Sequence, residues 1–172
     1  MHGNAAFCSN SRHQEFVMRK KALAAAFLFC AVQIAAVSQN FETISRIIES
    51  QEITVAQASY LAAQQFGAAE EEADERQSYE ALRASGCVSP ALEPDERISL
   101  KELCALYAKT SRAKGGMMFT LTKKSARYSY REFRAKGYIP SCADPMMSVS
   151  GADAIGLLNA LAAEQNQNEK TM

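Results

Sequence analysis

The chain of 172 residues contains no tryptophan and only two histidines, His2 and His13, both close to its N-terminus. Histidine is the commonest general base and the commonest metal ligand of proteins. The remaining sequence has no Ser/His/Asp set, no ligands with metal-binding spacing and no glycine-rich phosphate loop. These absences predict a protein that is not an enzyme and that uses no cofactor or metal.

Cysteine pairs with redox or metal-binding spacing are also missing. None of the five cysteines belongs to a C-x-x-C pair, which excludes a zinc knuckle and a thioredoxin-type dithiol. Cys87, Cys104 and Cys142 are the three that follow the N-terminal region. In an exported chain two of them could pair and leave one free, in three ways, or all could remain buried thiols. The sequence leaves these alternatives open.

Long apolar runs are scarce, and the one within residues 18–38 has the features of a signal peptide. Three cations at 19–21 precede it, and Ala36 and Ser38 occupy the small positions of a signal-peptidase site. Its apolar part is shorter than the about 20 residues of a transmembrane helix. We therefore predict a signal peptide over 1–38, cleavage after Ser38, and export to the periplasm or cell surface without a transmembrane anchor.

The residues around this signal refine the prediction. Residues 1–17 are polar and fit poorly before a signal peptide, which favours Met18 as the start of translation. Cys30 lacks the small preceding residue of a lipid-attachment site, so we do not predict lipidation.

Two stretches of the exported part, 78–108 and 129–159, match without a gap at an offset of 51 residues. Identical residues occupy 8 of the 31 positions, whereas composition alone would give about two. Gly86 and Gly137 coincide after short helical patterns, where a left-handed glycine ends a helix at little cost. This internal repeat predicts a duplicated helix–loop–helix unit.

The second helix of each unit is predicted to begin at a capping box. Ser99 and Ser150 can each accept from the backbone N–H three residues later, where Glu102 and Asp153 stand ready to reciprocate. Thr54 begins a third, similar arrangement. Each cap should contribute about 1 kcal/mol to stability.

The predicted fold is all-α, made of stacked helix–loop–helix repeats, two clear and one degenerate, over residues 39–163. Residues 41–50 supply the first helix of the degenerate unit, and 68–85 form a polar helix. The apolar run after Gly115–Gly116 breaks the pattern and predicts a short strand or β-hairpin near 117–130, or else an apolar loop. Residues 164–172 are polar and are predicted to be a disordered tail.

A helix, a glycine, a loop with proline and a second helix opened by [I/V]-[S/T]-x-x-[E/D] resemble the S-layer homology repeat, over most of residues 41–162. Repeats of that family are small helical modules that attach exported proteins to cell-wall polymers, so the resemblance implies a helical scaffold and a polymer ligand. The arginine with which that family helps to hold its anionic polymer is replaced here by Val55, Leu100 and Gly151. The resemblance therefore supports the scaffold better than the binding activity.

The formal net charge of the chain is zero, but two of its regions carry net charges of opposite sign. Residues 39–108 carry 5 basic and 13 acidic side chains, whereas 109–136 carry nine basic and one acidic. Cations interleaved with aromatic rings suit an anionic, ring-bearing polymer. We predict a polymer- or partner-binding site formed by Lys123, Lys124, Arg127, Tyr128 and Arg131. In the alternative interpretation, these cations face the acidic helix of the same molecule and the aromatic residues belong to the core.

Taken together, these patterns predict an exported, noncatalytic module that binds a cell-envelope polymer or an envelope protein. If residues 18–38 were instead retained as a core helix, residues 98–116 would resemble the start of a helix-turn-helix in a cytosolic nucleic-acid-binding protein. Export argues against a nucleic-acid partner. The two oppositely charged regions also allow salt-dependent self-association.

Overall fold

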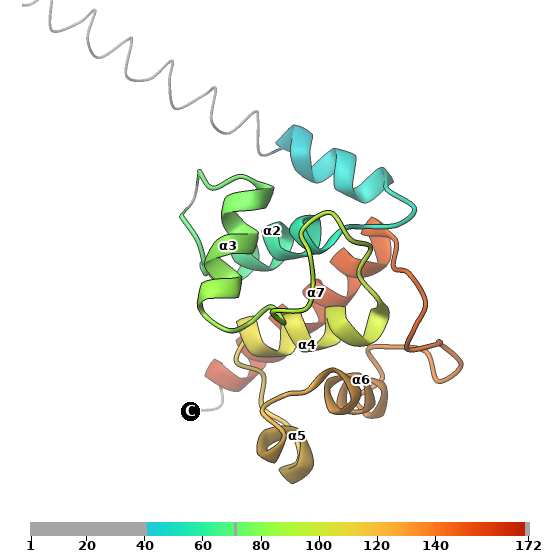
Figure 1. Cartoon of the computed structure of the whole chain (residues 1–172). Helices are drawn as coiled ribbons and strands as arrows, with labels where there is room; N and C mark the ends of the chain where they lie inside the picture. Colours follow the sequence, from blue (N-terminus) through green and yellow to red (C-terminus); the bar gives the residue numbers. More distant parts are fainter. Residues whose placement is uncertain (1–40, 71, 171–172) are drawn as a thin grey trace, which may run out of the picture. The chain divides into compact units, whose positions relative to one another are not determined.

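The computed structural model describes residues 41–70 and 72–170, with side chains as far as Gln167 (Figure 1). The chain divides into residues 1–43 and a second unit, 44–172. The predicted signal peptide and the Met18 start lie outside the described residues. Among the residues that are described, none of the helices combines the length and apolarity needed to cross a bilayer.

The all-α prediction is confirmed. Residues 41–49 are helical, and they are followed by α2 (Val55–Phe66), α3 (Glu75–Ala84), α4 (Leu100–Thr110), α5 (Met117–Leu121), α6 (Ala126–Ala135) and α7 (Gly151–Lys170).

Three predictions about the type or the extent of an element are wrong. The β-structure expected near 117–130 is absent, because these residues form α5, a turn and the start of α6. The helix expected over 68–85 begins only at Glu75, because Asp74 and Gln77 form a capping box there. The tail expected from residue 164 continues α7 as a helix to Lys170.

The duplicated unit is present in three dimensions. Helix α3 packs against α2, and α6 packs against α4 in the same way. Both α3 and α6 end in a left-handed glycine, with φ of 75° at Gly86 and 78° at Gly137. The N–H of Cys87 then donates to the Leu82 carbonyl, as that of Tyr138 donates to Phe133. These are Schellman endings, as the glycine positions predict.

Two buried tyrosines confirm the equivalence of the units. The Tyr79 hydroxyl donates to the Leu92 carbonyl, and the Tyr130 hydroxyl donates to that of Ala143. Both bonds span 13 residues. The arginine about one turn after each tyrosine, Arg83 or Arg134, has its guanidinium 5.7 Å from the centroid of the tyrosine ring. Each bond fixes the loop after the glycine onto the helix before it.

The three helix caps differ in detail. Thr54 forms the complete capping box. Ser150 accepts from the Asp153 N–H at 3.2 Å and donates to the Asp153 carboxylate. The capping box predicted at Ser99 does not form, since the Ser99 side chain accepts no backbone cap bond and the Glu102 N–H donates to the Ser99 carbonyl. The Ser99 hydroxyl donates to the Glu102 carboxylate at 2.9 Å instead.

The starts of α2, α4 and α7 are joined by a ring of backbone hydrogen bonds. The N–H of Val55 donates to the Glu96 carbonyl, in the loop before α4. In the same way Leu100 donates to Met147, in the loop before α7, and Gly151 donates to Ser50, ahead of α2. Each helix thus finds, in a neighbouring unit, an acceptor for an N–H that an isolated helix leaves unpaired.

Gly151 is the point at which this ring leaves no room for a side chain. A Cβ atom there would overlap the Ile47 carbonyl oxygen, which is backbone and cannot rotate away. We expect Gly151→Ala to lower the free energy of unfolding by about 2–3 kcal/mol. Urea denaturation of the two proteins measures the difference.

Gly156, one and a half turns later in α7, provides the matched control. A Cβ there meets no atom within 4 Å, so Gly156→Ala should raise stability by about 0.5–1 kcal/mol through helix propensity. Equal effects of the two substitutions would show that the ring does not constrain position 151.

The C-terminal part of α7 is held to α6 and the loop after it by one carboxylate. Glu164 accepts hydrogen bonds from Lys136 Nζ and from the Tyr138 hydroxyl, the latter at 2.8 Å. Partial burial alone would raise the pKa of Glu164, but the two hydrogen bonds outweigh it and hold that pKa below its ordinary value. Burial and the same carboxylate raise the pKa of Tyr138 to about 12.

Glu164 should therefore make stability depend on acid pH. A carboxyl whose pKa is lower in the folded state stabilises the protein above its unfolded pKa of about 4.3, and loses this effect as the pH falls through the folded pKa. We expect Glu164→Gln to cost about 1–2 kcal/mol at pH 7 and progressively less below pH 4. Urea unfolding at both pH values tests this, and a pH-independent loss would contradict it.

Candidate functional site

The predicted binding residues lie on α6 and on the turn between α5 and α6. Lys123, Arg127 and Arg131 are exposed, whereas Lys124 and Tyr128 are half-buried. Both lysines have positive φ, 52° and 57°, and so turn the chain from α5 into α6. The five residues are brought to one region of the molecule, but they do not share one role.

Lys124 is engaged inside the molecule. Its ammonium group donates to the Ala108 carbonyl in the last turn of α4, at 3.1 Å, and lies 6.0 Å from the centroid of the Phe119 ring. Partial burial lowers the pKa of this amino group. A cation is stabilising at the carboxyl end of a helix, so Lys124 serves the junction of α4 and α5 rather than the surface.

The exposed face of α6 carries a line of arginines. Arg127, Arg131 and Arg134 are spaced i, i+4 and i+7, which places them on one side of the helix. The Arg131 guanidinium lies 6.0 Å from the Tyr128 ring centroid. Arg134, which the predicted site omits, could have been found from its spacing alone. We call these three residues the arginine face.

The equivalent face of α3 is different, although the two helices are duplicates. Arg76, Glu80 and Arg83 stand there at the offset of 51 residues, and Arg76 pairs with Glu80 at 3.8 Å. In α6 the acid of this trio is replaced by Arg131. The scaffold therefore does not require three arginines at these positions.

The intramolecular alternative holds for the aromatic residues and for some cations. Tyr130 and Phe133 are buried in the core. Within the described part of the chain, Lys136 is the one cation of residues 109–136 in an ion pair, and its partner is Glu164 of α7 rather than the acidic run at 70–75. The arginine face stays directed to solvent.

Two apolar grooves lie at equivalent positions of the units, with volumes of about 310 and about 250 Å³. Residues at the offset of 51 line both, among them Ile139 and Leu157 in the larger and Val88 and Leu106 in the smaller. Each groove also contains a carboxylate, from Asp153 in the larger and from Glu102 in the smaller, where Lys109 accompanies it. An anionic ligand is therefore attracted more strongly by the arginine face than by either groove.

The other candidate chemistry has little structural basis. Cys87, Cys104 and Cys142 are all unpaired, and burial raises the pKa of the Cys104 thiol well above its ordinary value. Among the described residues no cluster of histidine, cysteine and acidic side chains could hold a metal ion. The segment 98–116 contributes α4, whose residues are mostly buried, and the next helix, α5, has five residues.

No protein-family model, no curated protein and no solved structure matches the chain. Its function therefore has to be argued from its own residues.

The two lysines of the α5–α6 turn can be separated experimentally. Lys124→Gln removes the donor to Ala108 and a charge at the end of α4, and should cost about 1 kcal/mol of stability. Lys123→Gln, at nearly the same backbone conformation but exposed, should change stability by less than about 0.5 kcal/mol. Thermal unfolding monitored by circular dichroism compares the two. Equal losses would place both lysines in the same structural role.

Proposed function

We propose that the protein is an exported, noncatalytic binding module whose arginine face binds an anionic polymer of the cell envelope. The observation that carries this proposal is the line of three exposed arginines on α6, at positions where the duplicate helix has a mixed-charge trio. The signal-like segment before Ser38 and the resemblance to S-layer homology repeats support the envelope as the location.

The geometry of the arginine face suits a polymer rather than a single small anion. A helix rises about 1.5 Å per residue, so Arg127 and Arg131 lie about 6 Å apart along α6, and Arg134 lies about 10 Å from Arg127. Phosphate or carboxylate groups repeated along a strand could contact several guanidinium groups in succession. Arginine is well suited to this because its planar group makes paired hydrogen bonds with such anions.

Tyr128 adds a flat surface beside the cations. Its ring is half-buried and lies against the Arg131 guanidinium, so both groups are held by their contact. A sugar ring could pack on the exposed part of the tyrosine while its charged substituents meet the arginines. This combination favours an anionic glycan over an acidic protein surface.

Capture by purified cell-wall sacculi tests the proposal. The double variant Arg127→Gln/Arg131→Gln removes two exposed cations. It should weaken capture about thirtyfold, since each charge-assisted contact contributes roughly 1 kcal/mol. Circular dichroism should show an unchanged fold, because both side chains project into solvent.

The matched control is Arg46→Gln/Arg76→Gln, which changes the net charge equally at two exposed arginines elsewhere. Their surface ion pairs contribute little to stability, and capture should stay close to that of the unmodified protein. If both double variants lose capture equally, the sacculi bind the protein through its net charge and not through the arginine face. If the α6 variant is captured normally, the arginine face is not the site.

A further inference from the structure

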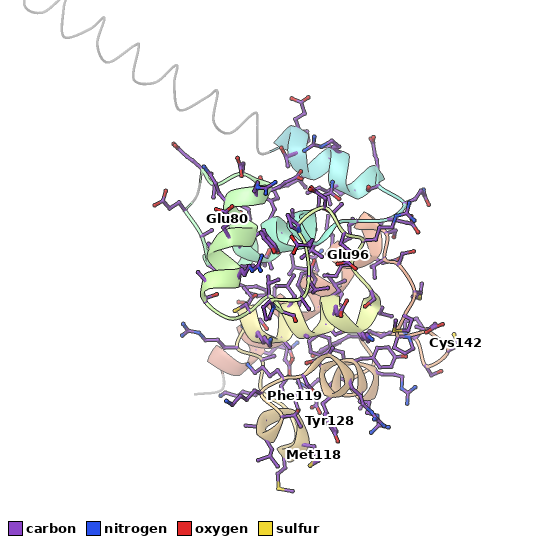
Figure 2. All side chains as sticks on the ribbon, in the orientation of Figure 1. Glu80, Glu96, Met118, Phe119, Tyr128 and Cys142 are labelled. Atoms are coloured by element: carbon purple, nitrogen blue, oxygen red, sulfur yellow. The ribbon has the colours of Figure 1, made fainter. Side chains whose placement is uncertain are left out.

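Helix α5 exposes large apolar side chains that the core does not use. Met117, Met118 and Leu121 are 80, 45 and 72% exposed, whereas Phe119 between them is buried. Figure 2 shows Met118 on the side of α5 that faces away from α4. Phe119 therefore anchors this short helix, and its other apolar side chains point outward.

Cations flank these apolar side chains on both sides. Lys114 and Lys123, which precede and follow α5, are exposed. Glu132, the one acid of residues 109–136, accepts a hydrogen bond from the Gly116 N–H at 3.3 Å. The outer surface of α5 thus combines apolar groups with positive charge, and we call residues 114–123 the α5 tip.

The duplicate unit shows that the fold does not require this composition. The link between α2 and α3, residues 67–74, contains Glu70 and Glu72 and forms no helix in its described part, whereas the longer link 111–125 contains α5. Both glutamates are exposed. The link before α3 is therefore acidic and has no counterpart of α5 in its described part, whereas the link before α6 is apolar and basic.

We propose that the α5 tip is a membrane-contact element for an anionic lipid surface. Met117, Met118 and Leu121 enter the boundary between headgroups and acyl chains, while Lys114 and Lys123 meet the lipid phosphates. This role is separate from polymer binding, because it uses α5 rather than the arginine face.

An anionic lipid surface matches the α5 tip better than a second copy of the chain does. A protein partner would have to offer an apolar patch bordered by acids. The helix 41–49 of a second copy has such a patch, with Phe41 and Ile48 exposed beside Glu42 and Glu49. A stable protein interface takes about 20–30 residues on each side, however, whereas the α5 tip comprises residues 114–123 alone. Lipid supplies both kinds of contact at once.

The absence of tryptophan from the chain allows a local test in the full-length protein. In Met118→Trp the indole is the sole tryptophan, so its emission reports on the α5 tip whichever other segment brings the protein to a vesicle. With vesicles of equimolar phosphatidylglycerol and phosphatidylcholine, we expect a blue shift and quenching by brominated phospholipid. Phosphatidylcholine vesicles should give neither.

Two matched variants complete the experiment. Met146→Trp labels another exposed methionine and should stay in water under all conditions. Adding Leu121→Glu to Met118→Trp replaces an apolar side chain of the α5 tip by glutamate, the residue type found in the link before α3. The fraction of protein whose indole is inserted should fall about tenfold. Since Leu121 is exposed, circular dichroism should be unchanged.

Three results would overturn the proposal. These are an indole at 118 that remains in water with anionic vesicles, an equal response at 118 and 146, and a blue shift that grows with protein concentration without lipid. The last would identify a second copy as the partner. The proposals of polymer binding and of membrane contact can be tested separately. Arg127→Gln/Arg131→Gln should weaken capture by sacculi, whereas Leu121→Glu should leave that capture intact.

Discussion

The hydrogen-bonded ring that joins the starts of α2, α4 and α7 is the constraint on which the rest of this structure depends. Each of these helices donates an N–H to the loop that precedes another of them, and the cycle closes when Gly151 donates to Ser50. Ile53, Ile98 and Val149, which precede the three caps, are buried around it. The repeated Ile/Val–Ser/Thr pattern thus marks both the start of a helix and the joint between units.

The ring joins the units, and the Tyr79 and Tyr130 hydrogen bonds each fix a loop within its own unit. Because these contacts are internal, the outer positions are free to differ. The buried tyrosines and the glycine endings are the same in both units, whereas Glu80 faces solvent where α6 has Arg131. Positions that are equivalent in structure but opposite in chemistry are the best evidence for function here, since the scaffold explains neither residue. The arginine face rests on such a position, and the α5 tip rests on a helix that the link before α3 lacks in its described part.

The features of the fold that depend on residues close together in the sequence were predicted correctly in most cases. The glycine endings and the Thr54 cap involve residues a few positions apart, and they form as expected. The Asp74–Gln77 capping box is an equally local pattern, and the start of α3 could have been predicted from it. The short apolar run 117–121 suits a strand or a helix equally well by pattern. Only the burial of Phe119 decides between them.

Contacts between distant residues account for the remaining errors, and they also show how far charge counts can identify a site. Glu164 continues α7 through partners 28 and 26 residues away, and Lys124 turns inward to reach a carbonyl 16 residues back. Of the nine cations in 109–136, Lys124 and Lys136 thus stabilise the fold, so the charge available to a partner is smaller than the sequence indicates. What remains outside lies mostly on α6 and on either side of α5, and these two helices pack against each other. If both proposals hold, one end of the module would contact lipid and polymer side by side, and so would hold the polymer close to a membrane surface.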